Sequence, residues 1–211
     1  MRKIKPLIYI FCEGESEVEY AKCLKEKYSD VAVIKKPVKG LFSEAESKFK
    51  KEIRYRNNVE VTDEIWFFFD VDHGQAGSWK NNYKIIETLR KLKKQPHIRV
   101  RLLMTSGCVE YWYLLHYEKI RPPVQSIAEK NKVMMLLKKH NPGYFKGDSI
   151  TISEIAQRMD VAVENGRWSL KNIEELLKLK DEDIRNQWLY HTEETFTTVQ
   201  EAIEFLENIR K

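Results

Sequence analysis

Long hydrophobic runs are absent from this sequence. No stretch approaches the roughly eighteen consecutive apolar residues that indicate a membrane-spanning helix. The basic start, residues 1–6, leads into a short apolar run, charge returns at Glu13, and no small-residue cleavage site follows, so a signal peptide is not indicated. We therefore expect a cytoplasmic protein with no membrane partner.

Cysteine is scarce as well. Cys12, Cys23 and Cys108 are an odd number, are widely spaced, and contain no CxxC pair. Free cysteines of this kind are mostly small buried hydrophobic residues. This use of cysteine fits a reducing compartment and agrees with the cytoplasmic location.

Several catalytic motifs are also missing. The sequence contains no Walker A motif, no GxGxxG and no GxSxG. Their absence disfavours an independent nucleotide-driven motor and a hydrolase of the serine type.

Charge is nearly balanced, with 37 basic and 32 acidic residues and a net charge of +5. An excess of this size permits nucleic-acid binding without establishing it. Basic residues concentrate in two stretches, 35–56 and 90–94, which fall on expected helices or loops. An ordinary solvated face explains them as well as a binding surface does.

The first half of the chain alternates apolar strands with helical patterns. Strands are expected at 6–12, 31–34, 64–69 and 98–104, and helices at 16–28, 43–55 and 78–94. Ser16 and Ser43 each begin an S-x-x-E capping box. The run EIWFFF is apolar on both faces, as in a central strand, whereas 98–104 alternates arginine with aliphatic residues and indicates a less buried strand. The βαβαβαβ order predicts right-handed crossovers and a largely parallel sheet.

The second half has no strand pattern of comparable strength. Helices are expected at 109–117, 126–139, 152–164, 170–179 and 198–210. The predicted fold class is therefore α/β: a parallel sheet flanked by helices in residues 1–120, and a mainly helical extension, residues 121–211, packed on that core.

Acidic residues follow two of the predicted strands. Glu13 follows the first strand, and Asp70 and Asp72 follow the third. The carboxyl ends of parallel strands share one edge of a sheet, where ligands bind, and side chains two apart on a strand point the same way. Such carboxylates repel one another unless a cation neutralises them. Hard oxygen ligands predict Mg²⁺ or Mn²⁺ at this edge.

Three further residues could contribute. Glu17 could face the same cleft if Ser16 caps the following helix, although a surface acid stabilised by the helix dipole is the alternative. Glu110, after the fourth strand, would complete a second metal site, and two cations about 4 Å apart suit phosphodiester hydrolysis. His73 is interpreted first as a hydrogen-bonding neighbour of the acids and only second as a metal ligand, because the carboxylates already satisfy a hard cation.

At these residues the sequence resembles the Toprim domain, whose signature is a glutamate after the first strand and a D-x-D after a later one. More narrowly, it resembles the RloB-like family, which is related to the AbiLii abortive-infection proteins. The resemblance covers most of the chain and is carried by the segments IFCEGESEVEY, FFFDVDH, TSGCVEYWYLLHY, NPGYFKGD, ENGRW and HTEETFTTVQEAIEFL. Two positions depart from the family: Ser106-Gly107 stands for the usual Asn-Pro, and His191-Thr192-Glu193 for the usual Asn-Pro-Ser.

The resemblance implies a Toprim-like sheet and a set of site residues. By analogy with OLD-type Toprim nucleases, Glu13, Glu17, Asp70, Asp72 and Glu110 would be the metal ligands. Lys146, in YFKGD, would join Glu13, Asp70 and Asp72 as a catalytic residue. A solvated loop lysine is the alternative for Lys146.

The resemblance also implies a function, an anti-phage defence effector that works with an ABC/SMC-type ATPase. The leading hypothesis is a metal-dependent endonuclease acting on DNA or RNA, tRNA included. The alternative is a non-catalytic module that docks on the ATPase, for which Trp79, Trp168 and Trp188 could form the interface. Primase-like Toprim chemistry is disfavoured, because neither a primase zinc motif nor a topoisomerase tyrosine context is evident. The oligomeric state stays open.

Overall fold

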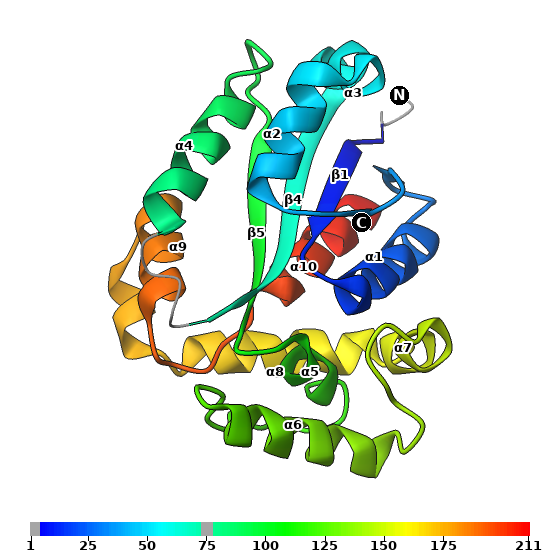
Figure 1. Cartoon of the computed structure of the whole chain (residues 1–211), viewed down its shortest axis with the longest axis vertical. Helices are drawn as coiled ribbons and strands as arrows, with labels where there is room; N and C mark the ends of the chain where they lie inside the picture. Colours follow the sequence, from blue (N-terminus) through cyan, green and yellow to red (C-terminus); the bar gives the residue numbers. More distant parts are fainter. Residues whose placement is uncertain (1–4, 73–77) are drawn as a thin grey trace.

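A parallel sheet of five strands lies at the centre of the molecule (Figure 1). The computed structural model describes residues 5–72 and 78–211. The strands are β1 (Leu7–Cys12), β2 (Val33–Ile34), β3 (Val38–Lys39), β4 (Thr62–Val71) and β5 (Arg99–Ser106). Their order is β2-β1-β4-β5, β3 pairs with the end of β1, and each of these pairings is parallel. The predicted parallel α/β architecture is confirmed.

The strand β4 is central because its side chains are apolar on both faces. Ile65 and Phe67 belong to one hydrophobic cluster, and Trp66 and Phe68 belong to the other. All four side chains are fully buried. A side-chain period of two therefore supplies both layers of the core from one strand.

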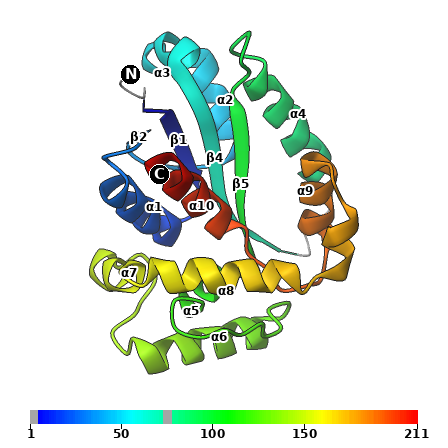
Figure 2. The same cartoon turned by 180° about the vertical axis from the view of Figure 1, so that it is seen from behind.

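The helices of the first half cover both faces of the sheet. They are α1 (Glu15–Lys27), α2 (Phe42–Lys51), α3 (Ile53–Asn58) and α4 (Trp79–Arg90), with a 3-10 turn η1 (Val59–Val61) before β4. Figure 1 shows α2, α3 and α4 in front of the sheet, and Figure 2 shows α1 on the opposite face.

The second half is mainly helical, as predicted. It contains α5 (Val109–Leu114), α6 (Ile127–His140), α7 (Ser149–Ala156), α8 (Met159–Lys171), α9 (Glu182–His191) and α10 (Val199–Arg210), with a 3-10 turn η3 (Glu174–Lys178). Helices α5 to α8 form a layer beyond the carboxyl ends of the strands, while α10 lies against the sheet beside α1 (Figure 2). Thr198 fixes the start of α10 to β5, because its N–H donates to the Met104 carbonyl at 2.9 Å and its Oγ1 accepts from the Met104 N–H at 2.8 Å. One hydrophobic cluster runs from β1 and α1 through α5–α8 to α10.

Helix boundaries differ from the predicted ones. Gly14, not Ser16, is the N-cap of α1, and the Glu17 side chain closes the capping box on the Gly14 backbone. Leu41, not Ser43, precedes α2, which ends at Lys51 because Glu52 is extended. The predicted helix 152–164 is divided into α7 and α8, the predicted helix 170–179 is the end of α8 plus the turn η3, and α9 was not predicted.

The strand β5 is more buried than predicted. Arg99 is exposed, but Arg101 is only 7% exposed and pairs with Glu64 of β4. An arginine alternating with aliphatic residues indicates a solvated face only when no acid on the neighbouring strand neutralises it.

Within the ranges that the structure describes, no helix combines the length and the apolar character needed to cross a membrane.

Candidate functional site

The site begins where β1 and β4 end side by side. The N–H of Glu13 donates to the Phe68 carbonyl at 2.9 Å and continues the pairing by one residue beyond β1. Its Oε2 accepts from the Asp70 N–H, also at 2.9 Å. The backbone of β4 therefore holds the Glu13 carboxylate beside Asp70.

Asp70 carries the most perturbed carboxylate at this edge. It follows Trp66 and Phe68 on the face of β4 toward α1, and its Oδ1 is buried without a hydrogen-bond partner among the described residues. Burial raises the pKa of Asp70 well above its usual range, and the negative charges of Glu17, Glu13 and Glu110 raise it further. A buried carboxylate oxygen without a partner is costly, which marks a position for a ligand.

Two glutamates before and within α1 stand next to Asp70. Glu17 is 4% exposed, and its Oε2 accepts from the Gly14 N–H at 3.1 Å. Burial, and then the charges of Glu13 and Glu110, raise the pKa of Glu17 to about 7. Burial also raises the pKa of Glu13 against the opposing effect of the Asp70 N–H.

Glu110 approaches from the helical layer. It lies in the first turn of α5, is 1% exposed, and accepts a hydrogen bond from the Tyr144 hydroxyl at 3.0 Å. Lys146 Nζ lies 3.5 Å from the same Oε1 of Glu110. Lys146, which the family resemblance brought in, therefore lies beside one of the predicted acids, and its own side chain is 67% exposed.

The loop that carries Lys146 is docked on the start of α1. Gly147 has a φ of +76°, and a Cβ there would lie 3.1 Å from the Cβ of Glu15. The Gly147 N–H donates to Ser16 Oγ at 3.0 Å. The close approach and the left-handed backbone both favour glycine, which explains the Lys-Gly order in YFKGD.

Asp72 is paired with a lysine of the helical layer. It follows β4 directly and forms an ion pair with Lys130 of α6. Its charge still raises the pKa of both Glu13 and Asp70. Among the described residues, it does not contribute to the two cavities at this edge.

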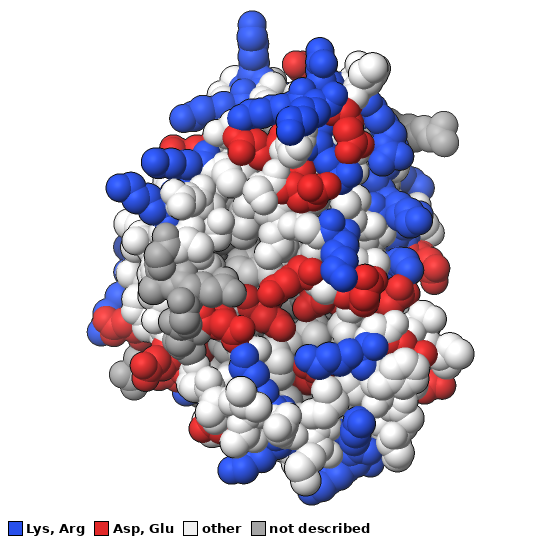
Figure 3. Space-filling view, viewed as in Figure 1, with Lys and Arg blue, Asp and Glu red and all other residues white. Residues whose placement is uncertain are grey.

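Two cavities open on either side of Glu13 and Asp70. One of 340 Å³ is lined by residues of α1 and of the loop with Lys146, namely Glu13, Gly14, Glu15, Ser16, Glu17, Asp70, Val109, Lys146 and Gly147. The other, of 420 Å³, is lined mostly from α2 and α4, by Glu13, Leu41, Phe42, Ser43, Phe69, Asp70, Ser78, Asn81, Asn82, Ile85 and Tyr190. Figure 3 shows acidic side chains in a band across this face, with basic side chains on both sides of it.

The donor set fits a hard divalent cation by its chemistry. Its ligand atoms are carboxylate oxygens, and the partnerless Oδ1 of Asp70 lies among them. No group of three Asp, Glu, His or Cys side chains in the described part of the chain is already arranged to hold an ion. The backbone, Tyr144, Lys130 and Lys146 each bind one of these carboxylates.

Two residues of the site were not predicted. Tyr144 lies two residues before Lys146 and is buried against Glu110, so its place in the NPGYFKGD segment was the available signal. Lys130 follows an ordinary capping box, Ser126 to Glu129, which gives no sign of a site, and its contact with Asp72 depends on how α6 packs. His73, predicted as a hydrogen-bonding neighbour, lies outside the described residues.

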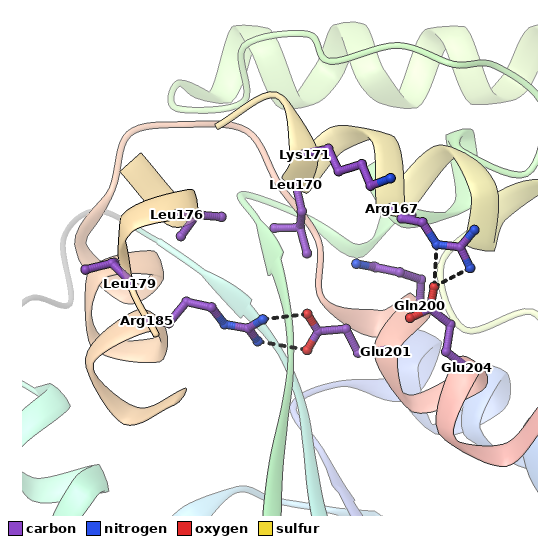
Figure 4. A pocket seen from close by; sticks show the side chains of 9 residues that line it. All are labelled: Arg167, Leu170, Lys171, Leu176, Leu179, Arg185, Gln200, Glu201 and Glu204. Carbon is purple, nitrogen blue, oxygen red and sulfur yellow. Dashed lines mark hydrogen bonds and ion pairs between the residues drawn. The ribbon is translucent and has the colours of Figure 1, made fainter. Parts of the chain in front are cut away.

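A further cavity of 280 Å³ lies away from this edge, between α8, η3, α9 and α10 (Figure 4). Arg185 binds both carboxylate oxygens of Glu201 at 2.8 Å, and Arg167 binds Glu204 at 2.8 Å. These pairs fix α10 to α9 and α8. None of the predicted site residues within the described ranges lines it.

The fold and the site together define a class: an α/β protein with a carboxylate cleft at the carboxyl edge of a parallel sheet and a helical layer closing it. Comparison with protein families identifies it further. The family of RloB-like proteins matches residues 8–206, and the chain belongs to that family. A search of curated proteins and a search of solved structures each found no match.

Proposed function

We propose that this chain is a Mg²⁺- or Mn²⁺-dependent nuclease of the Toprim type that hydrolyses nucleic-acid phosphodiesters. The observation that supports it best is the buried oxygen of Asp70, which has no hydrogen-bond partner among the described residues and lies within a group of like charges. Folding such a group costs free energy, and a site that binds a cation recovers it.

Each side chain has a role in this proposal. Glu13, Asp70 and Asp72 would hold one cation, and Glu17 and Glu110 would support a second. Bound cations would activate the attacking water and stabilise the leaving oxygen. Lys146 lies at the mouth of the cleft, where its ammonium can neutralise charge on the phosphate.

The biological setting is part of the proposal. Membership of the RloB-like family supports an anti-phage defence effector, working with an ABC/SMC-type ATPase in the cytoplasm. DNA and RNA, tRNA included, are both candidate substrates, because a carboxylate cleft does not distinguish them.

The test is a cleavage panel of DNA, RNA and tRNA with Mg²⁺ or Mn²⁺, with and without the ATPase. Asp70→Ala should abolish cleavage and keep the thermal melting curve of a folded protein. Arg185→Gln, in the distant cavity, is the matched control and should cleave normally where it folds. Equal cleavage by Asp70→Ala and the unmodified chain would refute the assignment.

The second candidate is a non-catalytic module of an ATPase complex. The observation that favours it is that the carboxylates of the described residues are not yet gathered around one point. The aromatic interface predicted for it is weakened, because Trp79 is 6% exposed and packs against Tyr190. A module without catalysis need not bind Mg²⁺ or Mn²⁺, so metal binding separates the two candidates.

A further inference from the structure

Two lysines of the helical layer bind two carboxylates of the cleft. Lys130, on α6, pairs with Asp72, and Lys146, in the loop before α7, pairs with Glu110. Both lysines come from the C-terminal half of the chain, and both acids follow strands of the sheet. The two ion pairs therefore join the helical layer to the segments that follow β4 and β5.

These pairs are built to exchange partners. The side chain of Lys130 is 28% exposed and that of Lys146 is 67% exposed, while the partner of Lys130, Asp72, is partly exposed and the partner of Lys146, Glu110, is buried. An ion pair whose two partners both reach solvent, such as Lys130–Asp72, contributes little to stability. A lysine also has a flexible stem and three donors, so it can move from one anion to another at small cost.

A divalent cation and an ammonium compete for the same carboxylate. Asp72 and Glu110 are both predicted metal ligands, and each already has a lysine at one oxygen. Binding of a cation would take these oxygens from the lysines. The lysines would then lie beside an acidic cleft that has lost much of its negative charge, with free N–H donors.

We propose that Lys130 and Lys146 are exchange lysines: they neutralise Asp72 and Glu110 in the metal-free chain and move to phosphate oxygens of nucleic acid when a cation is bound. The proposal rests on the proposed function and extends it. Metal binding and nucleic-acid binding become coupled, because the cation releases the lysines that bind the phosphates of the nucleic acid.

The coupling gives Lys130→Ala two effects of opposite sign. Losing the competing ammonium should tighten metal binding, by roughly two- to fivefold if the pair is a typical solvated one. Losing a phosphate contact should weaken nucleic-acid binding and reduce the slope of log K against log salt by about one. If the lysine only supported the fold, its removal would weaken both the metal affinity and the nucleic-acid affinity, or would change neither.

The experiment uses the full chain. Calorimetry with Mn²⁺ measures metal affinity, and fluorescence anisotropy of labelled single-stranded DNA, duplex DNA and RNA in Ca²⁺ measures nucleic-acid affinity over a salt series. Lys91→Ala is the matched control. Lys91 pairs with Glu87, is 70% exposed, and follows α4 near the amino end of β5, at the opposite edge of the sheet. Lys130→Arg keeps the charge and should retain nucleic-acid binding.

The outcomes separate the two proposals. Tighter metal binding with weaker nucleic-acid binding in Lys130→Ala, and neither change in Lys91→Ala, supports the exchange. The metal site stands if the unmodified chain binds metal and Asp70→Asn does not. The exchange is then still overturned if Lys130→Ala, with a normal melting curve, changes neither affinity or weakens both. Absence of metal binding in the unmodified chain overturns both.

Discussion

Glu64 and Asp70 lie on the same face of β4, six residues apart, with Trp66 and Phe68 between them. Glu64 is 4% exposed, and Arg101 of the neighbouring strand binds both of its oxygens at 3.1 Å. The Trp66 indole N–H also donates to Glu64. Asp70 also has a buried oxygen, but that oxygen has no hydrogen-bond partner among the described residues, and the negative charges of Glu17 and Glu13 act on the group.

The difference teaches how to distinguish a structural acid from a functional one. Both are acids on one apolar strand, so hydropathy alone does not separate them. Glu64 has a cation and hydrogen-bond donors from the chain itself, which makes its burial tolerable. Oδ1 of Asp70 has no such donor among the described residues, and the proposed cation would explain the cluster that Asp70 forms with Glu13 and Glu17.

The largest expected effect is a loss of stability when the buried ion pair of Arg101 and Glu64 is broken. Arg101→Ala should destabilise the fold by about 3–5 kcal/mol, because it leaves a buried carboxylate without its cation. Chemical denaturation measures this. The double variant Glu64→Leu, Arg101→Met should recover most of the loss, since a packed apolar pair replaces the ions. A loss under about 1 kcal/mol in the single variant would contradict the structural role.

The pH dependence of the stability should be a smaller effect than the loss of the Arg101–Glu64 pair, and it should come from the carboxylates of the cleft. Burial raises the pKa of Glu17 from its ordinary 4.5 to about 7, a difference worth about 3 kcal/mol at most. The neutral acid is the form that the folded chain favours. The contribution is therefore fully present below about pH 4.5 and is lost as the pH rises through about 7.

Thermal melting of the metal-free chain between these two pH values measures this loss. Glu17→Gln should flatten the dependence, while Glu201→Gln, at the distant Arg185 pair, should not. Metal affinity should change in the other direction and rise with pH, because carboxylates bind cations only when deprotonated. A melting temperature that rises with pH across this window in the unmodified chain would count against the cleft as described.

The sequence predicted the parallel sheet, and with it the adjacency of Glu13 and Asp70, for a physical reason. Alternating strands and helices dictate parallel pairing, and parallel pairing brings the ends of β1 and β4 together. Glu13 and Asp70 are adjacent because they follow or end these two paired strands. The resemblance to a family then brought in Lys146, which lies 3.5 Å from Glu110.

What the sequence could not predict depends on contacts between distant segments. Arg101 indicated a solvated face because its partner Glu64 lies 37 residues away on another strand. Lys130 is one of many lysines until α6 packs beside the end of β4. The S-x-x-E pattern at Ser16 placed the helix start two residues late, because a cap is decided by backbone conformation and Gly14 is extended there.

Calorimetric titration of Mn²⁺ and Mg²⁺ into the full chain near pH 8, compared with Asp70→Asn, tests the central claim most directly. The cleft should bind the cations in the unmodified chain. Asp70→Asn should lose that binding and keep a stability equal to or about 1 kcal/mol above the unmodified chain, since it removes a buried like charge. Equal cation binding by both chains, or none by the unmodified chain, would contradict the account.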